Sequence, residues 1–230
     1  MITEIIGVIG LGNAGGAVAG ALARKTKVVG FDPDPERCLR AGDLGVGCVS
    51  TTEELAEKTD HIILSLPKPE ISIAVTKTLC DSASRPKLLI ETSTVTPQTA
   101  VTCNDLCKQN DIAYVDAAIA GGVASMAAGE ITFFLGGAVE NKKLAHGILS
   151  LIAAGIYDLG PVGAGMGTKV VNNGVMHALM VVLIEAFSMS NKLGVSSQTM
   201  IEILNRQEGL LRPLVHRVQE RMQEGNYEGG

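Results

Sequence analysis

Short apolar runs alternate with helix-length segments along the first 160 residues of the chain. Strands separated by helices favour right-handed β-α-β units, and hence a mostly parallel sheet with helices on its faces. Because the chain has no Trp, 3% aromatic residues and 27 Gly, its core has to be built from small and branched aliphatic side chains, which suits such a sheet. The predicted strands are Glu4–Gly10, Lys27–Phe31, His61–Leu66, Lys87–Glu91, Ile112–Val115, Ile131–Leu135 and Gly155–Tyr157. The predicted helices among them are Gly12–Lys25, Pro35–Ala41, Thr52–Lys58 and Pro97–Lys108.

The pattern changes near residue 162. A long apolar stretch without a strand break begins near Gly165 and runs to about Leu193, which predicts one long helix. Two shorter helices are expected at Ser197–Asn205 and Arg212–Gln223. We therefore predict an α/β fold: a doubly wound, mostly parallel sheet in residues 1–161, followed by a short all-α domain in residues 162–230 that begins with the long helix.

Composition excludes several classes of partner. The formal net charge is −5 and the pI is near 5.4, so nucleic acid is not expected. No charged leader precedes the first apolar strand, so no secretion signal is expected. The longest apolar stretch, Val175–Phe187, contains His177 and Glu185 and is shorter than a bilayer span, so no membrane partner is expected. The five cysteines match no zinc or CxxC spacing, which favours reduced thiols in a cytoplasmic protein without a bound metal.

A GxGxxG pattern, Gly10-Leu11-Gly12-Asn13-Ala14-Gly15, stands where the first strand ends and the first helix begins. Its first Gly permits a tight turn, its second lets a pyrophosphate approach the backbone, and its third lets the helix pack closely on the strand. Asp32 ends the second strand, 22 residues after Gly10, where a carboxylate accepts hydrogen bonds from the adenosine ribose. The pattern predicts a Rossmann-like domain that binds NAD in preference to NADP, although the nearby Arg37 could accommodate a 2′-phosphate.

Five segments follow one another in a recognisable order: Gly10–Ala19, Leu66-Pro67, Ser93-Thr94, Asp116–Gly122 with the later Gly129, and Gly163–Asn173. Together they resemble the β-hydroxyacid dehydrogenases of the 3-hydroxyisobutyrate dehydrogenase group. The resemblance implies an NAD(P)-dependent oxidoreductase that transfers a hydride between a nicotinamide cofactor and a small β-hydroxy acid or its semialdehyde or keto form.

By resemblance, Lys169 is the catalytic acid/base on the long helix. Asn173 lies four residues later, on the same helix face, and is expected to bind the substrate; Asn172 borders that face. A lysine among apolar neighbours is partly desolvated, which lowers its pKa. The competing interpretation is a structural lysine whose aliphatic stem packs beside a helix start.

The resemblance also implies cofactor contacts at two strand ends. Leu66 and Pro67 close one strand, and Ser93 and Thr94 follow the next, at the sheet edge where ligands gather in such folds. The competing interpretation for Ser93 and Thr94 is ordinary loop chemistry before a helix that begins at Pro97.

Two departures from the family pattern concern the substrate. The family usually has a serine before paired glycines that hold the substrate carboxylate, whereas this chain has Ala120 before Gly121 and Gly122. The loss of that hydroxyl puts the usual short β-hydroxy acid in question more than the type of reaction. The family also continues into further helices, so we expect the chain to be shortened at its C-terminus relative to the family.

Three other functions stay open. A 6-phosphogluconate dehydrogenase-like enzyme also has a Lys followed by Asn-Gly on its helix, as in Lys169 and Asn173-Gly174. Imine reductases share the fold but usually lack the lysine. A non-catalytic dinucleotide-binding scaffold would bind the cofactor without turnover. In each case the apolar long helix predicts a homodimer or a larger homo-oligomer.

Overall fold

A computed structural model describes residues 5–206 of the chain, so the predicted helix Arg212–Gln223 lies outside the described residues. Eight strands form one sheet in the order β3-β2-β1-β4-β5-β6-β7-β8, and every neighbouring pair is parallel except β6 and β7. The strands are β1 (Ile6–Ile9), β2 (Val28–Phe31), β3 (Gly47–Cys48), β4 (His61–Leu64), β5 (Leu88–Glu91), β6 (Ala113–Ala120), β7 (Ile131–Gly137) and β8 (Ala153–Asp158). The predicted doubly wound sheet is thereby confirmed.

Nine helices connect or follow these strands in the part of the chain that the structure describes. They are α1 (Asn13–Ala23), α2 (Pro35–Gly42), α3 (Thr52–Lys58), α4 (Pro69–Asp81), α5 (Pro97–Lys108), α6 (Val123–Ala128), α7 (Val139–Leu149), α8 (Ala164–Lys192) and α9 (Ser197–Leu204). Their starts follow local sequence signals, as at α5, where Thr96 accepts a hydrogen bond from the Thr99 N–H at 3.1 Å and Pro97 takes the first helical position.

Two strand predictions need correction. β3 was not predicted, because two residues are too few to show a periodic pattern. β6 continues to Ala120, five residues beyond the predicted end at Val115, because its second half pairs antiparallel with β7. Ala120 is therefore the last residue of a strand and not part of a loop.

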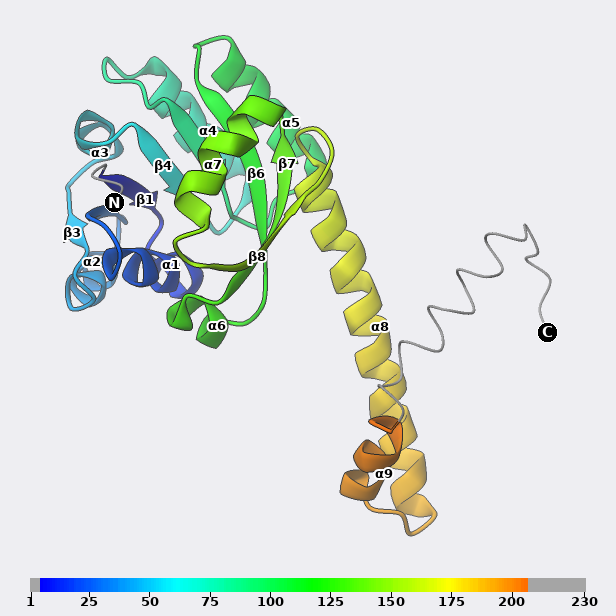
Figure 1. Ribbon diagram of the computed structural model, residues 1–230. Coiled ribbons are helices and arrows are strands. Elements are labelled where there is room, and N and C mark those ends of the chain that lie inside the picture. Colours follow the sequence, from blue (N-terminus) through cyan, green and yellow to red (C-terminus); the bar gives the residue numbers. More distant parts are fainter. Residues whose placement is uncertain (1–4, 207–230) are drawn as a thin grey trace, which may run out of the picture. The chain divides into compact units, whose positions relative to one another are not determined.

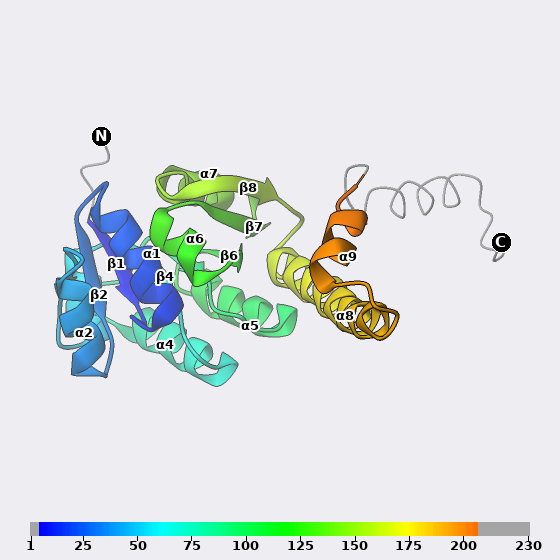
Figure 2. The same cartoon turned by 90° about the horizontal axis from the view of Figure 1, so that it is seen from below.

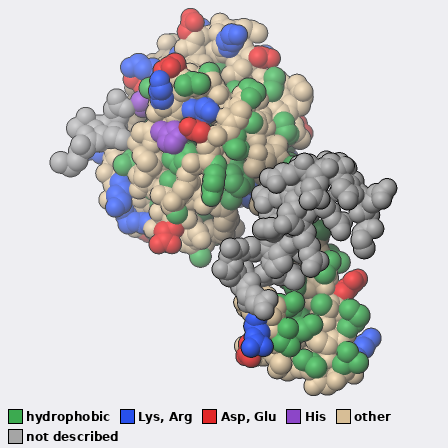
Figure 3. Space-filling model, turned by 45° about the vertical axis from the view of Figure 1, so that its right-hand side comes forward, with side chains coloured by type: hydrophobic (Ala, Val, Ile, Leu, Met, Phe, Trp, Pro, Cys, Tyr) green, Lys and Arg blue, Asp and Glu red, His purple; other side chains and the backbone are tan. Residues whose placement is uncertain are grey.

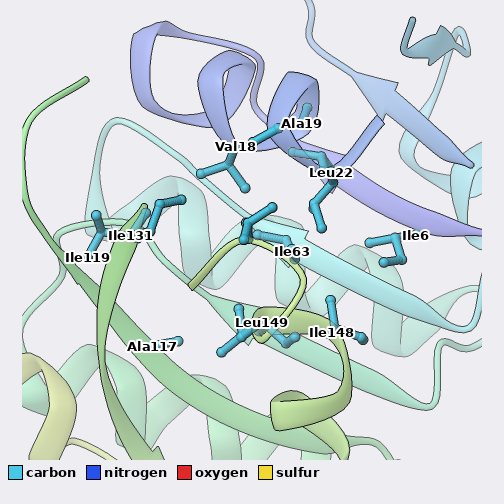
Figure 4. Close-up of a cluster of buried hydrophobic side chains, with 14 of the residues drawn as sticks. Ile6, Val18, Ala19, Leu22, Ile63, Ala117, Ile119, Ile131, Ile148 and Leu149 are labelled. Atoms are coloured by element: carbon cyan, nitrogen blue, oxygen red, sulfur yellow. The ribbon is translucent and has the colours of Figure 1, made fainter. Parts of the chain in front are cut away.

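Helices cover both faces of the sheet, and each face has its own apolar core (Figures 1 and 2). One core joins the strands to α1, α6 and α7, as Figure 4 shows for Val18, Leu22, Ile63 and Leu149. The opposite core joins the strands to α3, α4 and α5. Side chains of neighbouring residues in a strand point to opposite faces of the sheet, so one strand contributes to both cores. The burial of each large apolar side chain contributes about 1.5–3 kcal/mol to the free energy of unfolding. The strands are thus held rigidly, and so are the loops at their ends.

The chain consists of two compact units, Met1–Asn172 and Asn173–Gly230, and α8 begins in the first. The predicted long helix is confirmed. By length and composition it is also long and apolar enough to cross a membrane, with a mean hydropathy of 1.6 over its best window. The sequence analysis expected no membrane partner because the apolar stretch Val175–Phe187 is shorter than a bilayer span. The helix that contains this stretch is longer, so its length does not support that expectation.

Candidate functional site

The candidate site segments begin at one edge of the sheet. Ile9 is the register partner of both Phe31 and Leu64, and Leu64 is the partner of Glu91. Because these strands are parallel, the segments that follow them emerge side by side. This alignment brings the glycine loop, Asp32, Leu66-Pro67 and Ser93 to the same edge, as the sequence predicts.

The glycine loop has the geometry that its sequence requires. Gly10 has a φ of +91°, and a Cβ at this position would overlap the Ser65 carbonyl oxygen. A Cβ on Gly15 would overlap the Gly10 carbonyl oxygen, so α1 can lie this close to β1 only without a side chain there. A Cβ on Gly12, by contrast, would meet only the Arg37 guanidinium at 3.7 Å. The open space at Gly12 is where a pyrophosphate can approach the backbone and the start of α1.

A cavity of about 460 Å³ lies over this loop. Its lining is mostly apolar and also includes the start of a helix and Asp32, a combination that fits the apolar faces and the phosphates of a dinucleotide. Of the residues predicted at the cofactor, it is lined by Gly10, Gly12, Asn13, Ala14, Gly15, Asp32, Leu66 and Pro67. Leu11, Ser93 and Thr94 are not among its lining residues.

The Asp32 carboxylate is hydrogen-bonded to the glycine loop and to the backbone that follows it. One of its oxygens, Oδ2, accepts a hydrogen bond from the Leu11 N–H at 2.8 Å, and Oδ1 accepts one from the Asp34 N–H at 2.9 Å. Arg37 Nη1 lies 3.4 Å from Oδ2. The Asp32 side chain is only 3% exposed, whereas that of Arg37 is 42% exposed. The carboxylate therefore orients the glycine loop, and the guanidinium lies beside it at the more open side.

Ser93 connects two strand ends. Its hydroxyl accepts a hydrogen bond from the Leu66 N–H at 2.7 Å, and its own N–H donates to Glu91 Oε1 at 2.9 Å. Ser93 is 4% exposed, so its hydroxyl orients the Leu66-Pro67 segment from within the protein. Thr94, the next residue, is exposed to solvent.

Lys169 lies on α8 and is half-buried. Burial lowers the pKa of its ammonium below the ordinary value of 10.5. Within residues 5–206 no carboxylate pairs with this ammonium to oppose the shift. Asn172 and Asn173, three and four residues further along α8, are also half-buried. Asn173 is the first residue of the second unit.

The predicted carboxylate-binding segment follows β6. Ala120 is half-buried at the strand end, and Gly121 and Gly122 are exposed before α6. Gly122 precedes the first residue of α6 and no side chain caps this start, so backbone N–H groups are available there.

Two buried acids in the site region were not given a role by the sequence. Glu91 and Asp116 are both 0% exposed and are register partners, Glu91 as the last residue of β5 and Asp116 in the middle of β6. Asp116 accepts hydrogen bonds from the N–H groups of Gly163 and Met166 at the start of α8, at 2.8 and 2.9 Å. The sequence contained one signal for these residues, because each is the single acid in an otherwise apolar strand. A buried charge needs dedicated hydrogen-bond partners, so an acid at such a position indicates a specific role.

No group of three His, Cys, Asp or Glu side chains that could hold a metal occurs among the described residues. All five cysteines are free thiols.

Comparisons with known proteins agree with this geometry. A family model described as the NAD binding domain of 6-phosphogluconate dehydrogenase matches residues 5–171. A second, described as the NAD-binding domain of NADP-dependent 3-hydroxyisobutyrate dehydrogenase, matches residues 163–230. A probable 3-hydroxyisobutyrate dehydrogenase of Mycobacterium tuberculosis is 30% identical over 205 residues, which cover 89% of this chain and 70% of that protein. The human mitochondrial 3-hydroxyisobutyrate dehydrogenase is 28% identical over 208 residues, which are 62% of its length.

Solved structures show the same relationship. The M. tuberculosis 3-hydroxyisobutyrate dehydrogenase with L-serine superimposes with a TM-score of 0.83 at 30% identity, over 90% of this chain and 72% of that one. An imine reductase from a Pseudomonas species reaches a TM-score of 0.87 at 18% identity, which shows a shared fold only. Since matches to this group run from the glycine loop through α8, the chain belongs to the 3-hydroxyisobutyrate dehydrogenase family of NAD(P)-dependent hydroxyacid dehydrogenases.

Proposed function

We propose that the chain transfers a hydride between NAD and a small β-hydroxy acid, or its semialdehyde or keto form, with Lys169 as general acid/base. The observation that carries this proposal is the half-buried Lys169 ammonium, whose pKa burial lowers. A bound nicotinamide would supply the hydride acceptor or donor. In oxidation the neutral amine of Lys169 takes the proton of the substrate hydroxyl. In reduction the ammonium returns that proton to the carbonyl oxygen.

Substrate binding is proposed for the segment after β6 and for α8. The backbone N–H groups of Gly121 and Gly122 hold the substrate carboxylate, and Asn173, one helical turn beyond Lys169, orients the substrate. L-serine, with which the mycobacterial relative was solved, is itself a small β-hydroxy acid. This supports a substrate of the same class here.

The preference for NAD is proposed from Asp32. Its buried carboxylate stands at the cavity and disfavours a 2′-phosphate, while its hydrogen bonds to the loop hold it in place. Arg37 works in the opposite direction, but its guanidinium is already paired with Asp32 and with Asp34.

A second candidate substrate is 6-phosphogluconate, because a family model of that enzyme's NAD-binding domain matches residues 5–171. A phosphorylated substrate needs several cations close to its phosphate. Between Ala164 and Lys192, α8 carries only Lys169, His177 and Lys192 as basic side chains, which favours the unphosphorylated acid.

The test is NADH formation by the purified chain with a panel of short β-hydroxy acids and 6-phosphogluconate, and calorimetric binding of NAD and NADP alongside. Lys169→Ala should abolish turnover of the accepted acid and leave NADH affinity within about two-fold. Lys192→Ala, at the other end of the same helix, is the matched control and should leave both unchanged. Turnover that survives Lys169→Ala would contradict the role of the lysine, and NADH binding without any turnover would identify a scaffold.

A further inference from the structure

The start of α8 is anchored by one buried carboxylate from the sheet. Asp116 Oδ1 accepts a hydrogen bond from the Gly163 N–H at 2.8 Å, and Oδ2 accepts one from the Met166 N–H at 2.9 Å. These contacts join residues 47 and 50 positions apart in the chain.

Asp116 and two backbone carbonyls share the hydrogen bonding at the start of α8. The Ala164 N–H donates to the Pro161 carbonyl at 3.0 Å, and the Gly167 N–H donates to the Gly163 carbonyl at 2.8 Å. Two N–H groups that would otherwise lack partners, those of Gly163 and Met166, therefore converge on Asp116. A negative charge at a helix N-terminus is also favoured by the helix dipole, most of all when it is buried.

The anchored turn lies tightly against the sheet. A Cβ on Gly165 would overlap the Phe134 carbonyl oxygen and lie 2.9 Å from Asp116 Oδ2. A Cβ on Gly136, the register partner of Asp116, would lie 2.5 Å from Asp116 Oδ1. Neither position leaves room for the helix start to shift toward the sheet.

The anchor lies one turn before the proposed acid/base. Met166, which donates to Asp116, precedes Lys169 by three residues and is 1% exposed, so the turn that carries the lysine is fixed to β6. The same strand ends at Ala120, directly before Gly121 and Gly122. One strand therefore carries both the anchor of the lysine and the proposed carboxylate-binding segment.

We propose that Asp116 is a positioning residue that sets the place of Lys169 relative to the substrate-binding segment after β6. The proposal rests on the proposed function, since it needs Lys169 to act on the substrate. Asp116 touches neither substrate nor cofactor in this role. Its effect should appear in kcat and not in dinucleotide binding, because the glycine loop is held by Asp32.

The test is Asp116→Asn, which replaces one acceptor oxygen by an NH₂ group that faces N–H donors. We expect kcat to fall on the order of 10²-fold, the usual cost of a displacement of about 1 Å in a catalytic group. The NADH dissociation constant and binding stoichiometry should stay within about two-fold of wild type. Leu149→Ala, a buried substitution on α7, is the control for lost stability and should keep kcat per bound NADH. Equal losses of kcat in both variants would overturn the proposal.

Gly165→Ala provides a second variant if Asp116→Asn does not fold, because it leaves the carboxylate intact and displaces the same turn. It should show the same loss of kcat with unchanged NADH binding, and full kcat would overturn the proposal. A double-mutant cycle adds a readout that a structural role would not move. In a Lys169→Ala background supplied with ethylamine as proton carrier, no lysine remains to be positioned. Asp116→Asn should therefore lower kcat less than about three-fold there. Activity that survives Lys169→Ala without added amine would instead refute the role of Lys169 in the proposed function.

Discussion

Glu91, the last residue of β5, is the register partner of Asp116 in the middle of β6, and their two buried carboxyl groups accept hydrogen bonds from different numbers of donors. Asp116 accepts two hydrogen bonds, one on each oxygen, from the backbone N–H groups of Gly163 and Met166 at the start of α8. Glu91 accepts one from Ser93, and its Oε2 has no hydrogen-bond partner. Two neighbouring buried acids disfavour double ionisation, so the acid whose two oxygens both accept hydrogen bonds carries the charge. We assign the charge to Asp116 and the proton to Glu91.

The first prediction concerns the stability contributed by Glu91. Its pKa is raised above the ordinary 4.5, first of all by burial. The folded chain thus keeps this proton where the unfolded chain has lost it, and the free energy of unfolding falls as pH rises from about 4.5 through the folded pKa. Glu91→Gln removes this titration, so its melting temperature relative to wild type should rise as the pH increases above about 4.5. Exposed Glu57→Gln is the control, and a pH-independent difference for Glu91→Gln would contradict the assignment.

The second prediction concerns the pH dependence of turnover. Oxidation needs neutral Lys169, so kcat/KM for the hydroxy acid should rise with pH through a pKa below the ordinary 10.5. Reduction needs the ammonium, so its kcat/KM should fall through the same pKa. Arginine stays charged over this pH range, so Lys169→Arg should remove this pH-dependent change of kcat/KM from the profiles of both directions. Stopped-assay profiles of both directions check this, and a change retained in the arginine variant would assign it to another group.

Much of this site was predictable because its determinants are local. The turn at Gly10–Gly15 needs only adjacent residues, and the strand ends at Asp32 and Leu66 follow from short apolar runs. The bonds that hold the site rigid are not local. The contact between Leu66 and Ser93 spans 27 positions, and that between Asp116 and Met166 spans 50. No periodic pattern encodes which strand end meets which loop, so the roles of Glu91 and Asp116 became visible only in three dimensions.

The third prediction concerns cofactor choice. Asp32→Ser removes the carboxylate that faces the cavity and leaves Arg37 with one of its two carboxylate partners, Asp34. NAD affinity should fall about 10- to 100-fold, as for loss of a charged hydrogen bond, and NADP affinity should fall less or rise. Calorimetric dissociation constants for both cofactors check the ratio. Exposed Glu36→Gln removes a nearby surface charge and should leave the ratio unchanged. An unchanged ratio in Asp32→Ser would show that Asp32 acts on the loop alone.

The fourth prediction concerns substrate selectivity. Ala120 occupies the position where the family usually has a serine, half-buried at the end of β6. Ala120→Ser supplies a hydroxyl donor for the substrate carboxylate, so kcat/KM for short β-hydroxy acids should rise roughly ten-fold. The gain should appear mainly in KM. Ala127→Ser, on the exposed surface of α6, is the matched control. A fall in kcat/KM for every acid of the panel would mean that the chain accepts a substrate for which the hydroxyl is an obstacle.

The fifth prediction concerns self-association through the second unit. Hydrophobic side chains gather on the described part of this unit (Figure 3). The exposed ones are Val175, Met176, Met180, Val181, Val182, Ile184, Met189, Leu193, Ile201 and Ile203. An apolar surface of this extent is normally covered, and we expect a second copy of the chain to cover it. Light scattering at micromolar concentration should give at least a dimer, and Ile184→Glu should shift it toward monomer while exposed Gln198→Glu does not. A monomer that floats with lipid vesicles would contradict this, and would show instead that the length and hydropathy of α8 serve membrane binding.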